Sequence, residues 1–273
     1  MVSSSSVRST TASGSIVYES ERAVNEYLQY QYGTATDLLP FPIGPHSALH
    51  FLDQTVADCA NQVPATQRKR ALDVGCAVGG STFRLSKYFD EQVIGIDFSH
   101  GFVEAANRML EHGHASYTST VQGVITTEHV CTVPKDMYQH RHRIQFEQGD
   151  ACALAPELGQ FDAVLASNLL CRLPDPMAFL TRLSSLVKPG GIVALISPYS
   201  WLEEYTPKPK WLGGYVDEET GQPIDSFTTI AAVLSLDFEL VHRQDYPFMI
   251  REHERKYQWG ISDGCFWKRK EDS

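Results

Sequence analysis

The sequence lacks the features that mark membrane, secreted and zinc-binding proteins. No stretch approaches the run of about 18 apolar residues that a membrane-spanning helix requires. The start, MVSSSSVRSTTASGS, has no apolar signal-peptide core, although its serines and single arginine leave a targeting segment open. The six cysteines include no C-x-x-C pair and no histidine at zinc-ligand spacing. We therefore expect a cytoplasmic protein with reduced thiols, no membrane partner and no bound metal.

Basic residues are also too few for a general nucleic-acid binder. The chain has 23 Lys and Arg against 33 Asp and Glu, a net charge of -10. Binding to a phosphate backbone depends on clustered Lys and Arg, so nucleic acid is not expected as a partner. At 273 residues the chain suits one sizeable domain. We expect a disordered tail over residues 1–17 and a single domain over residues 18–273.

Short apolar strands alternate with helical patterns along most of this domain. Strands are predicted at 70–76, 92–99, 143–151 and 161–170, and residues 188–200 are predicted as a turn followed by the fifth strand. Helices are predicted at 79–89, 100–113, 176–187 and 225–235. Such alternation predicts a mostly parallel sheet with helices on both faces, the doubly wound Rossmann-like α/β fold. Two closing strand candidates, at 237–250 and 256–270, predict an antiparallel edge hairpin that brings the sheet to seven strands.

Two segments stand outside this alternation. Residues 18–62 precede the first core strand and carry helical patterns at 18–33 and 47–61. Residues 113–143 are rich in Thr and Val with partial alternation, which predicts an inserted hairpin or a pair of short strands.

The stretch RALDVGCAVGGSTFRLS, residues 70–86, places small residues at the tip of the first core strand. Gly75, Ala77, Gly79 and Gly80 lie where side chains would block a ligand approaching the backbone. In open parallel sheets, ligands bind beyond the carboxyl ends of the strands, where the winding reverses. The turn is therefore expected to bind a ligand; a tight turn that serves only helix–strand packing is the alternative.

The spacing of this turn separates the candidate cofactors. Asp73, Gly75 and Gly79 give Asp-x-Gly-x-x-x-Gly, which departs from the G-x-G-x-x-G of dinucleotide sites. No Lys-Ser/Thr pair follows, so the turn is not a nucleotide P-loop. An acid directly before the turn would repel pyrophosphate, and it suits a cationic ligand with an amino group. The pattern resembles that of class I S-adenosylmethionine-dependent methyltransferases.

Two later acids agree with this resemblance. Asp97 ends the second strand, where it would accept the ribose hydroxyls, with Phe98 beside it. Asp150, next to Ala151 in EQGDACAL, matches the position that accepts from the adenine amino group. An acid like Asp97 also occurs in NAD enzymes, and each acid could instead cap a helix. Acids at three successive strand ends together predict a site for S-adenosylmethionine, released as S-adenosylhomocysteine.

A closer resemblance concerns the methyl acceptor. YESERAVNEYLQYQYG, the core ALDVGCAVGGSTFRLSKYFDEQVIGIDFS, QGDACAL, SNLLCRLPDP and IREHERKYQWGISDGCFWKR resemble the C-terminal methyltransferase region of ovothiol-biosynthesis synthases. The resemblance spans residues 18–269 and is most specific in the two terminal segments. It implies methylation of an imidazole ring nitrogen of 5-thiohistidine. Those synthases carry an iron-dependent sulfoxide-synthase part that these residues do not include, so we expect a separate sulfoxide synthase or lyase as a pathway partner.

Such a transfer demands positioning more than acid–base chemistry. The ring nitrogen, the methyl carbon and the sulfonium sulfur must be collinear, with the reacting atoms about 3 to 3.5 Å apart. The thiolate of the substrate is a better nucleophile than the nitrogen. The pocket must therefore turn the thiolate away from the methyl group, and no metal is required.

The resemblance implies an N-terminal helical lid over residues 18–62 and the following acceptor-side residues. Asn168 ends the fourth strand, where its amide would hydrogen-bond the cofactor, the imidazole or local backbone. Tyr27 would face the sulfonium or the ring, with core packing as the alternative. Arg251 would clamp a carboxylate and His253 would accept a proton, a solvated charged turn being the alternative. Asn168, Tyr27 and His253 are thus the catalytic candidates. The remaining substrate-binding candidates are Tyr30, Tyr32, Cys171, Arg172, Tyr199, Trp201 and Tyr205.

Other functions remain open on the sequence. A class I methyltransferase could act on a phenol, a carboxylate or a different imidazole. A catalytically silent cofactor-binding protein would keep the same fold, although the intact set of three acids argues against it. The glycine spacing disfavours an NAD-linked oxidoreductase.

Overall fold

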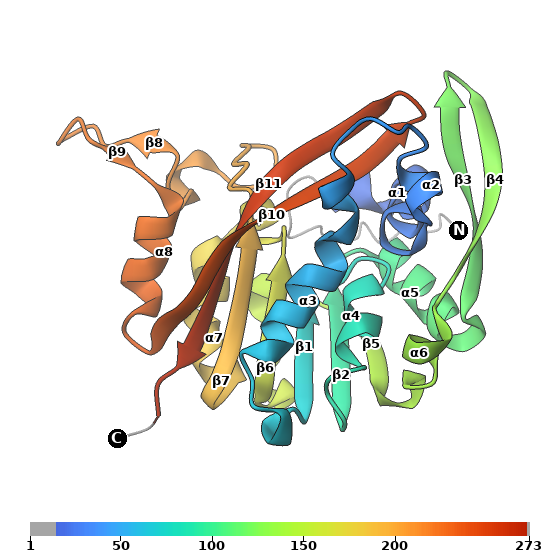
Figure 1. Cartoon of the computed structure of the whole chain (residues 1–273). Helices are drawn as coiled ribbons and strands as arrows, with labels where there is room; N and C mark the ends of the chain where they lie inside the picture. Colours follow the sequence, from blue (N-terminus) through green and yellow to red (C-terminus); the bar gives the residue numbers. More distant parts are fainter. Residues whose placement is uncertain (1–14, 272–273) are drawn as a thin grey trace, which may run out of the picture.

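A computed structural model describes residues 15–271 (Figure 1). A seven-stranded sheet in the order β10-β11-β7-β6-β1-β2-β5 runs through the molecule. Neighbouring strands are parallel from β7 to β5, whereas β11 is antiparallel to both β7 and β10. The predicted doubly wound α/β fold is confirmed. The winding reverses between β1 and β6, which makes the carboxyl ends of these strands the expected ligand site.

The bounds of the elements are as follows. The strands of the main sheet are β1 (Arg70–Val74), β2 (Gln92–Asp97), β5 (Ile144–Gln148), β6 (Phe161–Ser167), β7 (Val187–Ser197), β10 (Phe238–His253) and β11 (Lys256–Arg269). Two small hairpins are β3 (His114–Gln122) with β4 (Ile125–Thr132), and β8 (Tyr215–Val216) with β9 (Pro223–Ile224). The α-helices are α1 (Glu21–Tyr32), α2 (Ala35–Leu38), α3 (Phe51–Asn61), α4 (Gly80–Leu85), α5 (His100–His112), α6 (Lys135–Tyr138), α7 (Pro176–Leu186) and α8 (Ser226–Leu234).

Alternating side chains of the strands face two apolar layers. Leu72 of β1 packs in the layer that includes α7 and α8, and Ala71 faces the layer with α3 and α4. Figure 1 shows α3 and α4 in front of the sheet, with α7 behind it. Asp73 is the next residue on the α3–α4 face, so a carboxylate lies inside an apolar layer directly before the glycine turn.

The inserted segment forms the expected hairpin, β3–β4, which is a two-stranded sheet of its own. Asn25 of α1 donates from Nδ2 to Thr118 Oγ1 at 3.0 Å, and the Glu254 amide donates to the Thr120 carbonyl at 3.1 Å. The hairpin therefore contacts both α1 and the turn between β10 and β11. Those three elements lie together at one end of the molecule (Figure 1).

Several boundaries differ from the sequence expectation. The helix predicted at 79–89 ends at Leu85, where Ser86 turns its Oγ back to the Phe83 carbonyl at 2.7 Å. The helix predicted at 47–61 is a 3-10 turn until His50 and α-helical only afterwards. Residues 1–14 of the expected tail lie outside the described residues, and Ser15–Glu19 form a 3-10 helix.

Candidate functional site

A cleft of about 470 Å³ opens at the carboxyl ends of the parallel strands, where the winding reverses. The sequence-predicted residues that line it are Tyr27, Tyr30, Asp73, Gly75, Ala77, Asp97, Phe98, Asp150, Ala151, Asn168, Arg172 and Tyr205. They come from strand ends far apart in the sequence, from α1 and from the segment after β7. The three acids singled out in the sequence thus share one cavity.

The glycine turn contains three residues with positive φ, two of which are glycines. Gly75 has φ +78°, and a Cβ there would lie 2.9 Å from the Leu169 side chain. Ala77 also has positive φ, at +48°, in a region that non-glycine residues seldom occupy. Gly79 has φ +91° and precedes α4, but it does not line the cleft. A Cβ on Gly79 would lie 2.5 Å from the Phe146 ring, so this glycine serves packing rather than ligand approach.

Asp97 is held in place by two backbone amides. Its Oδ2 accepts the Ala77 amide at 2.8 Å, and its Oδ1 accepts the Ser99 amide at 2.9 Å. Burial raises the pKa of this carboxyl to about 6, and the two amide donors oppose that rise. Each oxygen keeps a further lone pair. The carboxylate can therefore accept two additional hydroxyl groups without moving.

Asp73 is a buried carboxyl group without a positive partner in the described chain. It is 1% exposed, and Thr82 Oγ1 donates to its Oδ2 at 2.7 Å. Burial raises its pKa to about 7, the Thr82 hydroxyl lowers it, and the negative charge of Asp97 adds to the rise. A buried carboxyl of this kind fits a ligand that brings a positive charge, as the ammonium group of S-adenosylmethionine would.

Asp150 and Asn168 complete the strand-end set. Asp150 Oδ1 accepts the Cys152 amide at 2.8 Å and so caps a 3-10 turn, while the residue also lines the cleft. Asn168 has φ +53°, and its Oδ1 accepts Ser262 Oγ at 2.7 Å. The helix-cap alternative for Asp150 is therefore compatible with a place in the cleft. The Asn168 side-chain amide bonds to a side chain of β11 and not to local backbone.

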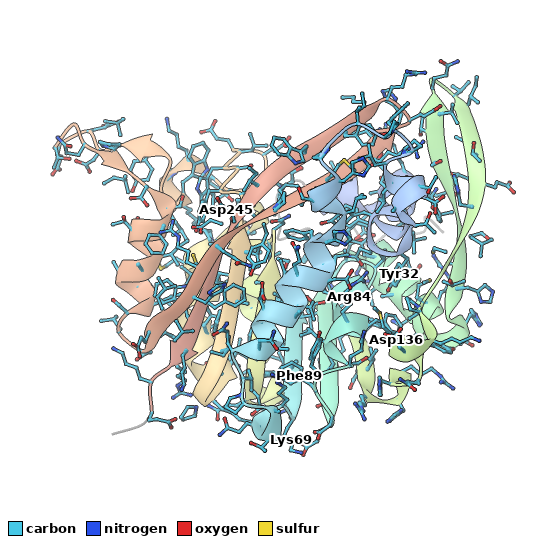
Figure 2. The ribbon with its side chains drawn as sticks, viewed as in Figure 1. Tyr32, Lys69, Arg84, Phe89, Asp136 and Asp245 are labelled. Carbon is cyan, nitrogen blue, oxygen red and sulfur yellow. The ribbon has the colours of Figure 1, made fainter. Side chains whose placement is uncertain are left out.

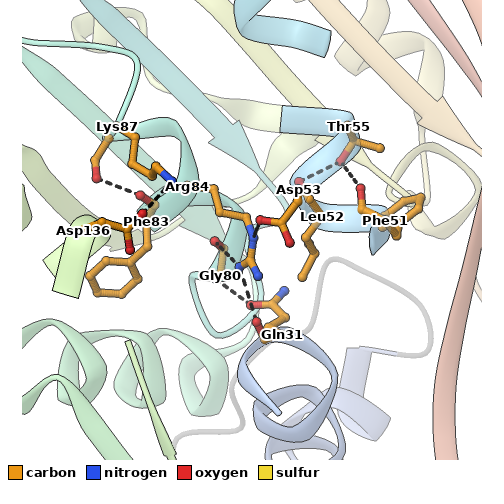
Figure 3. Close-up of polar contacts among 11 residues, drawn as sticks. Gln31, Phe51, Leu52, Asp53, Thr55, Gly80, Phe83, Arg84, Lys87 and Asp136 are labelled. Carbon is orange, nitrogen blue, oxygen red and sulfur yellow. Dashed lines mark hydrogen bonds and ion pairs between the residues drawn. The ribbon is translucent and has the colours of Figure 1, made fainter. Parts of the chain in front are cut away.

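Helix α1 contributes one face to the cleft and is bonded to the glycine turn. Gln31, which the sequence analysis did not select, accepts the Gly80 amide with its Oε1 at 2.6 Å (Figure 3). Arg84 donates to the carbonyls of Gly80 at 3.0 Å and Gln31 at 3.3 Å, and pairs with Asp53 of α3 at 2.7 Å. The two helices before the core thus hold the start of α4. The cleft-lining residues of α1 are Ala23, Glu26, Tyr27, Tyr30 and Gln31, at the spacing of one helical face.

Aromatic rings form much of the remaining wall. Tyr27 packs against Phe102 with ring centroids 4.8 Å apart and edge-on to Tyr30 at 6.1 Å. Burial raises the pKa of both tyrosines far above the ordinary value of 10. Their phenols stay protonated and can act only as hydrogen-bond donors or weak acceptors. The Tyr30 hydroxyl is buried and has no partner among the described residues.

Five predicted substrate residues do not line the cleft. Tyr32, which is labelled in Figure 2, donates to the Val78 carbonyl of the glycine turn at 2.9 Å. Cys171 is fully buried in the apolar layer beneath the cleft. Tyr199 donates to Asp263 at 2.9 Å, and Trp201 donates to Ser226 Oγ at 2.8 Å. Arg251 donates to the Asp37 carbonyl. Tyr32, Tyr199, Trp201 and Arg251 each donate a hydrogen bond within the fold, and Cys171 packs in the core.

The predicted proton acceptor His253 also lies outside the cleft lining. It ends β10, and its Nδ1 accepts the Arg255 amide at 3.2 Å. The neighbouring strands do reach the cleft, and the sequence analysis missed their contribution. Those residues are Phe248, Ile250, Gln258, Trp259 and Gly260. The alternation of side chains along the two strands that flank the charged turn could have predicted these residues. Residues 248 and 250 share one face of their strand, and residues 258 and 260 share one face of the next.

Comparison with known sequences agrees with this geometry. Residues 72–195 match the model of a methyltransferase-domain family. These residues form a class I methyltransferase domain. Its cofactor is S-adenosylmethionine, which is consistent with the acids that line the cleft at three strand ends.

Relatives of this methyltransferase domain use different acceptors. The chain is 25% identical to the sterol 24-C-methyltransferase of Aspergillus fumigatus over 236 residues, 80% of this chain and 55% of that protein. It is 30% identical to a ubiquinone biosynthesis O-methyltransferase of Xanthomonas campestris over 152 residues, 56% of this chain and 52% of that protein. The chain thus spans about half the length of the relatives it matches. Their acceptors do not transfer to it.

A solved structure shares the fold of the methyltransferase domain. The cyclase SpnF superposes with a TM-score of 0.53 and 16% identity, covering 86% of each chain. The likeness shows the fold alone, and a cyclase on this fold means that the acceptor chemistry must be argued from the cleft. Within residues 15–271, no helix is long and apolar enough to cross a membrane. In the same residues, no three His, Cys, Asp or Glu side chains gather as a metal site.

Proposed function

We propose that this methyltransferase domain transfers a methyl group from S-adenosylmethionine to an imidazole ring nitrogen of 5-thiohistidine, a step of ovothiol biosynthesis. The observation that carries the proposal is the position of the two segments that most resemble ovothiol synthases. Residues 18–33 supply Tyr27, Tyr30 and Glu26 to the cleft, and residues 250–269 supply Gln258 and Trp259. Both segments in which the chain most resembles ovothiol synthases thus line the cleft, which supports an acceptor of that family.

The cofactor half of the proposal rests on the three acids. We assign Asp97 to the ribose hydroxyls, because its two oxygens are fixed by amides and keep free lone pairs. Asp73 is assigned to the ammonium group, because it is buried and no cation of residues 15–271 pairs with it. Asp150, with Phe98 and Ala151, is assigned to the adenine. When bound, the cofactor supplies an activated methyl group on a sulfonium.

The acceptor half rests on the size and lining of the cavity. A cleft of about 470 Å³ lies toward the lower end of ligand pockets, which run from roughly 300 to 1,000 Å³. A small planar acceptor fits beside the cofactor in a cavity of this size. Tyr27, Phe248 and Trp259 offer aromatic faces to such a ring, and the Asn168 amide lies at the end of β6.

Tyr30 gives the site a means of controlling the substrate sulfur. Its hydroxyl is buried without a partner, and burial keeps it protonated. A thiolate is the anionic acceptor that would satisfy this donor. A bond from Tyr30 would hold the sulfur away from the methyl group and leave the ring nitrogen to attack.

The test is a reaction of the purified protein with S-adenosylmethionine and 5-thiohistidine. We expect a product one methyl group heavier, with NMR placing the methyl on a ring nitrogen. Histidine, cysteine and a simple phenol serve as competing acceptors. Methylation of the phenol in preference to thiohistidine would replace this function by the alternative of another small acceptor. Binding of S-adenosylhomocysteine without turnover of any acceptor would indicate a silent cofactor-binding protein.

A further inference from the structure

Arg172 brings a positive charge into the cleft, and no carboxylate of residues 15–271 forms an ion pair with it. It ends a 3-10 turn, Leu170–Arg172, that follows β6. It is also the only Lys, Arg or His among the described residues that line the cleft. The site therefore contains one cation and several acids.

The guanidinium is held in a fixed orientation by neutral groups. Its Nη1 donates to the Ser200 carbonyl at 2.9 Å and to the Cys171 carbonyl at 3.3 Å. Its central carbon lies 4.5 Å from the centre of the Tyr205 ring, which in turn stacks on Tyr18 at 6.3 Å. Both carbonyl bonds use Nη1. The Tyr18 hydroxyl also bonds to the guanidinium. No carbonyl or carboxylate of residues 15–271 bonds to its Nε–Nη2 edge, which is the edge that pairs with a carboxylate through two parallel bonds.

The negative charges around Arg172 explain why an anionic ligand would need this cation in order to bind in the cleft. The protein has a net charge of -10, and Asp73, Asp97 and Asp150 line the same cavity. An anionic acceptor would be repelled from such a cleft unless a positive group met it. Glu26, the remaining acid of the lining, already pairs with Arg22 at 2.7 Å.

We propose that Arg172 forms a carboxylate subsite, so that the methyl acceptor is a small molecule bearing a carboxylate, as an amino acid does. This inference rests on the proposed function, because it takes the molecule bound by Arg172 to be the methyl acceptor. It moves the carboxylate clamp from Arg251, which donates to the Asp37 carbonyl outside the cleft, to Arg172 inside it.

Calorimetry on protein loaded with S-adenosylhomocysteine tests the subsite without turnover. The probes are 3-(imidazol-4-yl)propanoate and its primary amide, with phenylacetate and phenylacetamide as a second pair that lacks the imidazole. For wild-type protein we expect each acid to bind at least about tenfold more tightly than its amide, the scale of hydrogen bonds to a charged group. In Arg172→Met this preference should disappear, and Arg172→Lys should recover only part of it. Arg108→Met, on the exposed side of α5, is the matched control.

The possible results separate the subsite from the proposed function. Equal binding of acid and amide by wild-type protein, or no binding of any probe, overturns the subsite even if thiohistidine is methylated. A preference confined to the phenyl pair supports the subsite and counts against an imidazole acceptor. If Arg172→Met lowers the affinity for S-adenosylhomocysteine as much as it lowers that for the acids, Arg172 holds the cofactor carboxylate and the proposal is wrong. Thermal unfolding of each loaded variant verifies that it is folded.

Discussion

Single residues in the cleft fall into two groups according to their hydrogen bonds. Asp97 and Asn168 already have bonds from the protein, so their orientations are set before any ligand arrives. Asp73 and Tyr30 are buried with incomplete partners. The first group preorganises the site. In the second group, a buried carboxyl lacks a cationic partner and a buried hydroxyl lacks a hydrogen-bond partner among residues 15–271, and a ligand can supply them. Substitutions should therefore affect the two groups differently.

Asp73→Asn should stabilise the protein without cofactor and weaken cofactor binding. Because the folded pKa of Asp73 is about 7, above its ordinary value of 3.8, the folded state binds the extra proton between these values and loses stability as pH rises through this window. Removing the ionisable group should raise the free energy of unfolding at pH 7.5 by about 1 to 2 kcal/mol, below the full linkage value because the site relaxes. Urea denaturation measures the difference, which should shrink toward pH 4. A destabilised variant at pH 7.5 would contradict this account.

Tyr30→Phe should change where the methyl group goes more than how fast it is transferred. Phenylalanine keeps the ring that packs edge-on to Tyr27 and removes only the unpartnered hydroxyl. With thiohistidine as acceptor, we expect the share of S-methylated product to rise several-fold. Mass spectrometry and NMR of the product mixture measure this share. Tyr117→Phe is a matched control, because its hydroxyl is also buried without a partner but lies outside the cleft lining. An unchanged product ratio in Tyr30→Phe would remove the hydroxyl from the proposed role.

Among the elements, α1 both lines the cleft and bonds to the start of α4. Its face contributes to the cleft, while Gln31 at its end accepts the Gly80 amide at the start of α4. Arg84 and Asp53 extend the contact to α3 (Figure 3). A displacement of α1 would therefore disturb the glycine turn as well as the acceptor wall. The predicted lid is, in this respect, also a support for the cofactor loop.

Gln31→Leu tests this coupling. The variant leaves the Gly80 amide buried without an acceptor, which should cost about 1 to 3 kcal/mol of stability. We expect faster hydrogen exchange in α1 and α4 together, and several-fold weaker binding of S-adenosylhomocysteine. Gln67→Leu, at an exposed 3-10 turn far from α1, is the control. Faster exchange in α1 alone would mean that the helix and the turn are not coupled.

The core elements could be predicted from sequence because their signals are local. The strands and the acids at their ends follow from apolar runs of fixed length and from turn chemistry, and Asp73, Asp97 and Asp150 do line one cleft. The tip of the β10–β11 hairpin was harder, because whether Arg251 or Trp259 faces the ligand depends on the register of two long strands. The structure pairs Arg251 with Tyr257 and places Trp259 opposite Met249. No local pattern sets that register.

The same limit applies to side chains with two possible partners. Tyr199 and Trp201 follow β7 as predicted, yet they donate to Asp263 and Ser226. Their partners lie 64 and 25 residues away in the chain. Such pairings come from tertiary packing. A count of aromatic residues after a strand cannot distinguish a cleft wall from a core. All three aromatic residues of this segment were therefore predicted to bind substrate, although only Tyr205 lines the cleft.

For the molecule as a whole, cofactor binding, stability and pH are linked through the two buried acids. A ligand that binds only the folded state stabilises it by mass action, by RT ln(1 + [L]/Kd). Asp73 and Asp97, with pKa values raised to about 7 and about 6 by burial, must both be ionised to receive an ammonium and two hydroxyls in the proposed way. Protonation of either group competes with the ligand. The affinity should therefore fall as pH is lowered through this range.

We accordingly expect the rise in unfolding temperature caused by S-adenosylhomocysteine to be larger at pH 8 than at pH 5.5. The ligand-free baseline runs the other way, because raised carboxyl pKa values favour the folded state at the lower pH. Differential scanning calorimetry with and without a fixed excess of ligand separates the two trends. In Asp73→Asn, most of the pH dependence of the ligand-induced shift should vanish, since the group with the pKa nearest neutrality is gone. A shift that stays constant, or grows, as the wild-type protein is acidified would mean that the buried carboxylates do not hold the cofactor.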